Sequence, residues 1–340
     1  MNLRPATAID RDSLKLLMER TPNCSRLKIE KQHRRLDKAY REGKLCIPVS
    51  ETEDQKWWRC EARFMLGDYS NWDGWEYRDG WSATLWHWRD TRPYQVLPWN
   101  CLPTDCLYII GEQGVGDVIF FASCIQDCLP LAKKIILECD ERLRKVCERN
   151  FGIETVAANF IDEGRRRKKR PLPDGVTAWA SLGDLPRMWR QSLDHFPGTP
   201  YLTADPEQVE RFSAYRGRTG YSWRGGQGSV KELALQDGVS LQYDQAWDED
   251  MQRPDLDLRD DIEGVLGLLA NLDKVVTVST SVAHFAAAMG KETHVIIADH
   301  ATALRERIYN FPFKWVCRKT PGRTPWYNSA RVYNSLKEYL

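Results

Sequence analysis

The sequence predicts an α/β protein built from two halves of similar architecture, and two observations carry this prediction. The first is the order of a short apolar run, a glycine-rich turn and a helix-spaced apolar segment over residues 107–121, which is typical of a strand, a tight loop and a helix. The second is a similar junction downstream, where the β-branched run 274–278 is followed by the polar run 279–281 and the helical segment 282–289. Two such junctions predict two mostly parallel sheets that face a common cleft.

The composition narrows the function classes. A chain of 340 residues is long enough for two or three domains, and its net charge of +1 provides no global field that would attract nucleic acid or anionic lipid. Ten cysteines lack the paired spacing of metal sites, which favours reduced, buried thiols. The N-terminus has no apolar signal-peptide core, and no stretch reaches the roughly 20 apolar residues of a membrane span. We therefore expect a cytoplasmic protein without a membrane span.

The N-terminal region predicts a helical appendage. Helix-spaced apolar residues occur over 10–20, 27–41 and 51–66, with prolines at the breaks. These apolar positions are sparse, so the helices must pack on another part of the chain to be stable. Together with the aromatic segment that follows, they form the first expected unit, residues 1–100.

Aromatic residues are concentrated between positions 68 and 100. The tryptophans of this segment are Trp72, Trp75, Trp81, Trp86, Trp88 and Trp99, and they alternate with Tyr69, Tyr77, Tyr94, Asp73, Arg78 and Arg89. Flat rings stack on sugars and nucleobases, so the segment is one candidate for a ligand platform. The alternative is that the rings attach the helical appendage to the next domain. We favour the attachment, because aromatic side chains contribute large areas to buried packing.

The first α/β half is expected over residues 101–216. Its predicted strands cover 106–110, 134–137, 154–157 and 177–180, with helices after the first, second and fourth strands. A basic run lies between two of these strands and consists of Arg165, Arg166, Arg167, Lys168, Lys169 and Arg170. Such a run is usually a solvated loop. The alternative is a contact with the phosphate backbone of a nucleic acid.

The second α/β half is expected over residues 217–327. A helix over 206–215 and the segment Arg216-Gly217-Arg218 lead into it as an interdomain hinge. Its predicted strands cover 219–223, 239–241, 274–278 and 293–298, and an acidic segment supplies an aspartate cap for a helix that ends at Asn271. Residues 328–340 are predicted to form a short amphipathic helix that returns to the first half.

The glycine-rich loop suggests an anion site or a hydroxyl site. Gly114, Val115 and Gly116 allow the backbone to approach a ligand closely, and the helix that follows directs free N–H groups into the loop. Asp117 is placed either to cap this helix or to act as a base that faces the ligand, and the spacing favours the cap. The loop lacks the Gly-Lys-Ser/Thr of a Walker motif and the acidic residue of a dinucleotide site.

A second group of candidates surrounds the downstream junction. Arg224 and Lys231 flank a glycine-rich loop that follows a predicted strand, which suits either a diphosphate clamp or an exposed turn. His284 lies one turn into the helix that Ser281 begins, on the turn that presents Thr280 to the cleft. A single histidine at such a place is more often packed than catalytic, but this position favours a role in the site.

Taken in order, these motifs resemble the glycosyltransferase domain of bacterial tetratricopeptide-repeat glycosyltransferases and, more distantly, the ADP-heptose heptosyltransferases. The resemblance extends from about residue 60 to the C-terminus, and the N-terminal unit looks like the last repeat helices of that family. The segments that carry it are FMLGDYSNWDGWEYR at 64–78, GEQGVGDVIFFAS at 111–123, FPGTPYLTADP at 196–206, SLQ at 240–242, STSVAHFAAAMGK at 279–291 and TPWYNSARVY at 324–333.

The resemblance implies a GT-B fold and a metal-independent transfer of sugar from a nucleotide-sugar co-substrate, without a resident cofactor. Asp117 matches the general base of the heptosyltransferases, and the loop at 114–116 would face the acceptor. The donor residues implied by the resemblance are Arg224, Lys231, Gln242, Ser279, Thr280, Ser281 and His284. The family usually has an aspartate at the position of Ser279.

Three acceptor classes and one rival function follow from these patterns. The family implies a glycan or a protein as acceptor, whereas the basic run and the aromatic rings suggest a hydroxymethylated DNA base. The rival is a binding module with a GT-B-like fold that has lost its chemistry, and the serine at position 279 favours it.

Overall fold

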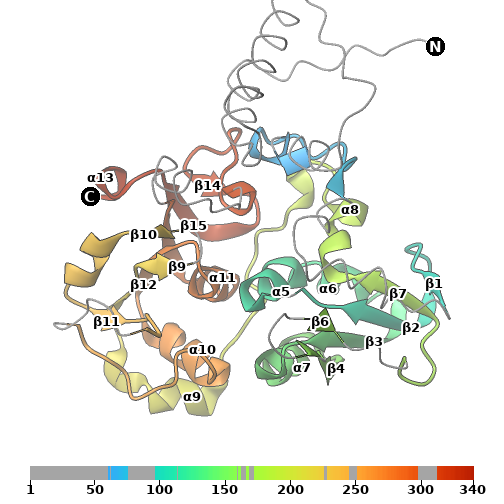
Figure 1. Ribbon diagram of the computed structural model, residues 1–340, viewed down its shortest axis with the longest axis horizontal. Helices are drawn as coiled ribbons and strands as arrows, with labels where there is room; N and C mark the ends of the chain where they lie inside the picture. Colours follow the sequence, from blue (N-terminus) through green and yellow to red (C-terminus); the bar gives the residue numbers. More distant parts are fainter. Residues whose placement is uncertain are drawn as a thin grey trace, which may run out of the picture.

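The computed structural model describes residues 60–75, 96–161, 166–167, 172–225, 228–244, 251–297 and 312–340, apart from positions 62, 113 and 159. The described residues form two main sheets, of five and six strands, with helices between and around them (Figure 1). The prediction of an α/β protein with mostly parallel sheets is confirmed. The helices expected over 10–20 and 27–41, and most of the one over 51–66, lie outside the described residues.

The first sheet has the order β1-β7-β2-β3-β4, and all of its strand pairs are parallel. Strand β2 is buried over its last five residues, as expected for a parallel strand covered on both faces. A separate antiparallel pair joins β5 to β6. The strands are β1 (Leu97–Pro98), β2 (Thr104–Ile110), β3 (Ala132–Cys139), β4 (Glu154–Ala157), β5 (Phe160–Ile161), β6 (Arg166–Arg167) and β7 (Ala178–Ser181).

Short helices follow these strands at the predicted places. The helix α5 opens directly after the glycine-rich loop, and α7 follows β3. The α-helices of this half are α5 (Val115–Ala122), α6 (Ile125–Cys128), α7 (Arg144–Phe151) and α8 (Pro186–Trp189). The 3-10 turns are η2 (Glu141–Leu143), η3 (Leu182–Asp184) and η4 (Leu193–His195).

The second sheet has the order β11-β8-β12-β13-β15-β14, and every pair is parallel except β14 with β15. A short antiparallel pair, β9 with β10, projects from the end of β8. The strands are β8 (Thr219–Ser222), β9 (Arg224–Gly225), β10 (Gly228–Ser229), β11 (Val239–Ser240), β12 (Lys274–Val278), β13 (Glu292–Ile296), β14 (Arg323–Thr324) and β15 (Tyr327–Tyr333).

The helices of this half are α9 (Pro206–Arg211), α10 (Ile262–Asn271), α11 (Ser281–Ala288) and α13 (Leu336–Tyr339), with the 3-10 turns η5 (Ser213–Tyr215), η6 (Lys231–Leu235) and η7 (Pro312–Lys314). The predicted aspartate cap is confirmed, because Asp261 accepts a hydrogen bond of 2.8 Å from the Gly264 amide. Helix α9 packs against α10, beside the second sheet. The unit boundary expected at 216/217 stays a prediction.

The predicted C-terminal helix over 328–340 is wrong for most of its length. Residues up to Tyr333 form β15, which pairs in parallel with β13, and only α13 is helical. Tyr327, Ala330 and Val332 are buried while Asn328 and Arg331 are exposed, which is close to the alternation of a half-buried strand. Leu336 and Tyr339 of α13 pack on the second sheet, so this end does not return to the first half.

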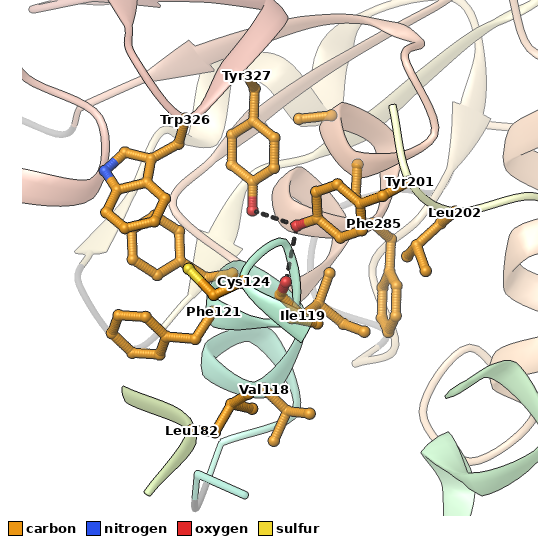
Figure 2. Packing of buried hydrophobic residues seen from close by; sticks show 14 of the residues in the cluster. Val118, Ile119, Phe121, Cys124, Leu182, Tyr201, Leu202, Phe285, Trp326 and Tyr327 are labelled. Atoms are coloured by element: carbon orange, nitrogen blue, oxygen red, sulfur yellow. Dashed lines mark hydrogen bonds between the residues drawn. The ribbon is translucent and has the colours of Figure 1, made fainter. Parts of the chain in front are cut away.

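The two halves meet along α5 and α11, which contact each other between the sheets (Figure 1). The linker residue Tyr201 contacts both: its amide donates to Ala288 O at 2.9 Å, and its hydroxyl donates to Ile119 O at 2.7 Å (Figure 2). A second contact between the halves is the ion pair of Arg149 on α7 with Glu263 on α10. The core is therefore continuous between the two sheets.

The described tryptophans of the aromatic segment are packing residues, while the helices that they were expected to attach lie almost entirely outside the described residues. Trp72, Trp75 and Trp99 are buried. The indole of Trp72 donates to Arg190 O at 3.1 Å, and that of Trp75 donates to Gly183 O at 2.7 Å. These rings therefore attach residues 60–75 to the first half. The predictions about Trp81, Trp86, Trp88, Tyr77, Tyr94, Arg78 and Arg89 lie outside the described residues.

The described cysteines carry free thiols, and seven of these eight are buried. Burial raises the pKa of Cys124 to about 12. Within the described ranges, no helix combines the length and the apolar character needed to cross a membrane.

Candidate functional site

The glycine-rich loop leads into α5, as predicted, but Asp117 does not cap it. Gly114 is the N-cap residue, and no side chain accepts a hydrogen bond there. Asp117 lies in the first helical turn, three positions after the cap. The capping interpretation of Asp117 is therefore wrong, because its carboxylate has another partner.

That partner is Lys314 at the end of η7. The Lys314 ammonium forms an ion pair with the Asp117 carboxylate, although 196 residues separate them in the chain. The side chain of Lys314 is 19% exposed and that of Asp117 is 40% exposed, so the pair lies at the border between core and solvent. The ammonium also lies 5.3 Å from the centre of the Phe120 ring. The negative charge of Asp117 in the first half and the positive charge of Lys314 in the second half thus neutralise each other.

The N-terminus of α11 is also without a side-chain cap. Thr280 is the N-cap residue in extended conformation, and its hydroxyl lies 3.2 Å from the Thr277 hydroxyl instead of accepting from a helix amide. Ser281, the first helical residue, is exposed. An uncapped first turn presents amide donors and a partial positive charge, which is the arrangement that binds phosphate groups.

Gly116 brings the two helix starts together. A β-carbon at this position would lie 3.2 Å from both the Ser281 Cα and the His284 Cδ2 atoms, closer than most side chains tolerate. The glycine therefore allows the first turn of α5 to lie directly against the first turn of α11. As a result, Asp117 lies one residue away from the contact between the two helix starts.

His284 is buried within this contact. Its ring is 4% exposed and stacks on Trp315, with the ring centres 4.6 Å apart. Burial, and to a smaller extent the charge of Lys314, lowers the His284 pKa well below that of a free histidine. The imidazole is therefore neutral at physiological pH and acts through hydrogen bonds.

Two tyrosine hydroxyls lie beside this imidazole. The Tyr201 hydroxyl donates to Ile119 O at 2.7 Å and lies 3.4 Å from the Tyr327 hydroxyl (Figure 2). The Tyr327 hydroxyl lies 3.1 Å from His284 Nδ1. This hydrogen bond holds the imidazole ring in one orientation, and the tautomer of the ring decides which of the two groups donates the proton.

Trp315 holds Ser279, the residue before the N-cap of α11. Its indole N–H donates to the Ser279 hydroxyl at 2.9 Å. Ser279 therefore accepts a hydrogen bond from Trp315 at the position where the family that the sequence resembles usually has an aspartate. The oxygen that accepts from the indole lies next to the N-cap residue Thr280.

Arg224 and Gln242 lie on the other side of the α11 start. A β-carbon on Gly225 would lie 2.9 Å from Ser279 O, so β9 passes close to this loop. The Gln242 amide accepts from Arg224 N at 3.0 Å and donates to Arg224 O at 3.3 Å. The Arg224 guanidinium pairs with Asp244 at 3.1 Å. Gln242 thus holds the backbone of Arg224, whose half-exposed cation faces outward.

The remaining predicted residues are Lys231 and those of the basic run, which the structure describes only in part. Lys231 opens η6 and is exposed. Of the basic run, Arg166 and Arg167 form β6, while Arg165, Lys168, Lys169 and Arg170 lie outside the described residues. In the described part of the chain, no cluster of three or more His, Cys, Asp and Glu residues is arranged to hold a metal ion.

Sequence reasoning missed three residues of this site: Lys314, Trp315 and Tyr327. The signal for Tyr327 was available, since it belongs to the quoted segment TPWYNSARVY. Lys314 and Trp315 lie in FPFKWVC, which has no regular period, and the fold alone brings them next to Asp117 and His284.

No protein-family model matches the chain. The protein FlbA of Caulobacter vibrioides is 26% identical over 273 residues, which are 67% of this chain and 43% of FlbA. The chain thus spans less than half the length of this relative.

Three solved structures are similar to the chain. The ADP-heptose LPS heptosyltransferase II of E. coli has a TM-score of 0.42 and 14% identity, over 67% of this chain and 90% of that one. A glycosyl transferase of family 9 from Veillonella parvula has a TM-score of 0.44 and 11% identity, over 70% and 88%. The iron-containing dodecameric glycosyltransferase TibC of enterotoxigenic E. coli has a TM-score of 0.38 and 11% identity, over 58% and 59%.

Proposed function

We propose that the protein is a glycosyltransferase of GT-B type that moves a sugar from a nucleotide-sugar donor to an acceptor hydroxyl. The observation that supports this proposal most directly is the contact of Gly116 with Ser281, which joins a carboxylate and an uncapped helix start in one site. A carboxylate is the group that a base-assisted transfer needs, and a helix start suits a diphosphate. The ordered motifs in the sequence support the same function.

The donor binds to the second half in this proposal. The free amides of Thr280 and Ser281 hold the diphosphate, and Arg224 and Lys231 add positive charge from the loop above β8. His284 forms a hydrogen bond with a donor hydroxyl. Gln242 acts indirectly, because its side chain is engaged with the backbone of Arg224.

The acceptor binds against the loop at 114–116, and Asp117 is the general base. The proton of the acceptor hydroxyl passes to the Asp117 carboxylate while the acceptor oxygen bonds to the anomeric carbon. The bond from that carbon to the phosphate oxygen breaks, and its electron pair leaves on the diphosphate. Fixed donors and cations stabilise this charge.

The experiment that tests the function uses purified protein, a panel of nucleotide sugars, and three acceptor classes: glycans, proteins and hydroxymethylated DNA. Mass spectrometry detects the sugar added to one of them. Asp117→Asn should lower the rate by about a hundred- to ten-thousand-fold while nucleotide binding is kept. Asp105→Asn is the matched control, because it removes a carboxylate from an exposed ion pair with Lys133.

The outcomes separate the candidate functions. Transfer to one acceptor that depends on Asp117 establishes the enzyme and its substrate class. Nucleotide binding without transfer to any acceptor, and without hydrolysis, would favour a binding module. Absence of both binding and transfer would refute the proposal.

A further inference from the structure

Lys314 is a charged member of the site to which neither the sequence motifs nor the proposed donor contacts assign a role. It reaches from η7 in the second half to the base candidate Asp117 in the first half. Its backbone is anchored, because the Thr324 hydroxyl donates to Lys314 O at 2.7 Å. The position of the lysine is therefore built into the fold, while its side chain is long enough to move.

The surroundings of the ammonium make its contact with Asp117 important. Its Nζ atom lies 5.3 Å from the centre of the Phe120 ring and 6.0 Å from that of Phe313. Aromatic faces attract a cation only weakly compared with a carboxylate, and partial burial strengthens ionic interactions. If Asp117 lost its charge, the Lys314 ammonium would need another anion.

The segment that carries Lys314 also contacts the N-terminus of α11. The neighbouring residue, Trp315, donates to the Ser279 hydroxyl directly before the N-cap and stacks on His284 of α11. The Lys314 charge also contributes to the lowered pKa of His284. The residue next to Lys314 therefore contacts the place where the diphosphate binds in the proposed function.

We propose that Lys314 couples the base to the leaving group by passing from Asp117 to the departing diphosphate during transfer. This inference rests on the proposed function. When the acceptor proton neutralises Asp117, the ammonium loses its partner in the same step in which the diphosphate gains one negative charge. The two changes balance, because one proton moves to the carboxylate and one electron pair moves to the phosphate oxygen. The Lys314 ammonium then leaves the neutral Asp117 and pairs with the diphosphate.

The coupling predicts a pattern in binding that needs no turnover. Before transfer, the diphosphate and Asp117 compete for Lys314. Asp117→Asn releases the lysine and should therefore tighten the binding of a nucleoside diphosphate by about tenfold, whereas Lys314→Gln should weaken it by about tenfold. In the double variant, the gain from Asp117→Asn should disappear, because there is no lysine to release.

Isothermal titration of ADP, GDP and UDP into the wild type, the two single variants and the double variant measures this pattern. Lys314→Arg tests whether a cation alone suffices, and it should keep most of the wild-type affinity. Lys133→Gln is the matched control, since it breaks an exposed ion pair with Asp105 elsewhere. Thermal unfolding of each variant verifies that it is folded.

The results distinguish four situations. Loss of the Asp117→Asn gain in the Lys314→Gln background supports the coupling. If the gain persists without the lysine, it reflects simple repulsion by the carboxylate, and the coupling is overturned. Equal affinities in all variants would make the pair a structural clamp and would also overturn the coupling. If none of the three nucleotides binds the wild type, the proposed function fails first and the inference falls with it.

Discussion

The Nδ1 atom of His284 lies 3.1 Å from the hydroxyl of Tyr327. This hydrogen bond holds the imidazole ring in one orientation. A second histidine–tyrosine pair lies in the second sheet, where His294 Nδ1 is 2.9 Å from the Tyr333 hydroxyl. The two pairs allow a matched comparison of structure with function.

Tyr327→Phe should affect both stability and substrate binding. Loss of the buried hydroxyl leaves His284 Nδ1 without its hydrogen-bond partner and should lower the free energy of unfolding by about 1–3 kcal/mol in urea denaturation. It should also raise the KM for the nucleotide sugar, because the imidazole orientation is no longer fixed. Tyr333→Phe should affect stability alone. Equal KM values for the two variants would contradict a role of Tyr327 in the site.

The stability of the protein should fall with acidification because of His284. Its pKa in the native state is lowered well below 6.5 by burial, so the native imidazole stays neutral. In the unfolded chain it takes up a proton as the pH falls below about 6.5, so the unfolded state binds more protons. This group should therefore remove up to about 1.4 kcal/mol per pH unit from the free energy of unfolding below pH 6.5, and nothing above it.

Urea denaturation of His284→Asn between pH 7.5 and 5 checks this dependence. The variant should have a flatter pH profile than the wild type. His294→Asn is the comparison, because the His294 pKa is lowered by burial but the contact with Glu292 opposes the shift. Its profile should change less. An unchanged slope in His284→Asn would show that His284 is not the group that titrates.

Gly116→Val should separate the first turns of α5 and α11. The new β-carbon would lie 3.2 Å from the Ser281 Cα atom, and the branched side chain adds further overlap. We expect a loss of about 1–3 kcal/mol in urea denaturation and a weaker binding of nucleoside diphosphates. Gly116→Ala should be milder, because the better helix propensity of alanine offsets up to about 1 kcal/mol. Equal stability of the valine variant and the wild type would contradict the close contact.

Trp75→Ala should detach the segment 60–75 from the first half. The indole is buried and donates to Gly183 O, so its removal leaves a large cavity and an unpaired carbonyl. We expect a loss of about 3–5 kcal/mol, measured by chemical denaturation. Tyr243→Ala is the control, since that ring is 63% exposed and should cost little. A loss below about 1 kcal/mol for Trp75→Ala would restore the surface-platform interpretation.

The fold could be predicted where the pattern of apolar residues was strong. The strands β4 and β12 and the cap at Asp261 agree with prediction because apolar runs and flanking turn residues are local signals. Strand β15 was predicted as a helix because its alternation of buried and exposed residues is short and mixed with polar residues. Its pairing with β13 depends on residues that are far away in the sequence. Local patterns cannot specify a parallel neighbour.

The site could be predicted only where its residues lie at a junction between a strand and a helix. Asp117 and His284 were found because each lies near the start of a helix that follows a strand. Lys314 has no such context, since the residues around it have no period and its partner is far away in the chain. The cap predicted for Asp117 failed for the same reason: the spacing identifies helix starts, but it does not reveal a cation that arrives from another part of the fold.

Tyr201 and Arg149 hold the two halves at two separate points. Tyr201 bonds to α5 and to the end of α11, and Arg149 pairs with Glu263 on α10. The ion pairs of Lys314 with Asp117 and of Arg142 with Asp260 join the halves at two further places, and α5 packs along α11 between them. Because these contacts are spread along the whole interface, a rotation of one sheet against the other about any axis would break at least one of them.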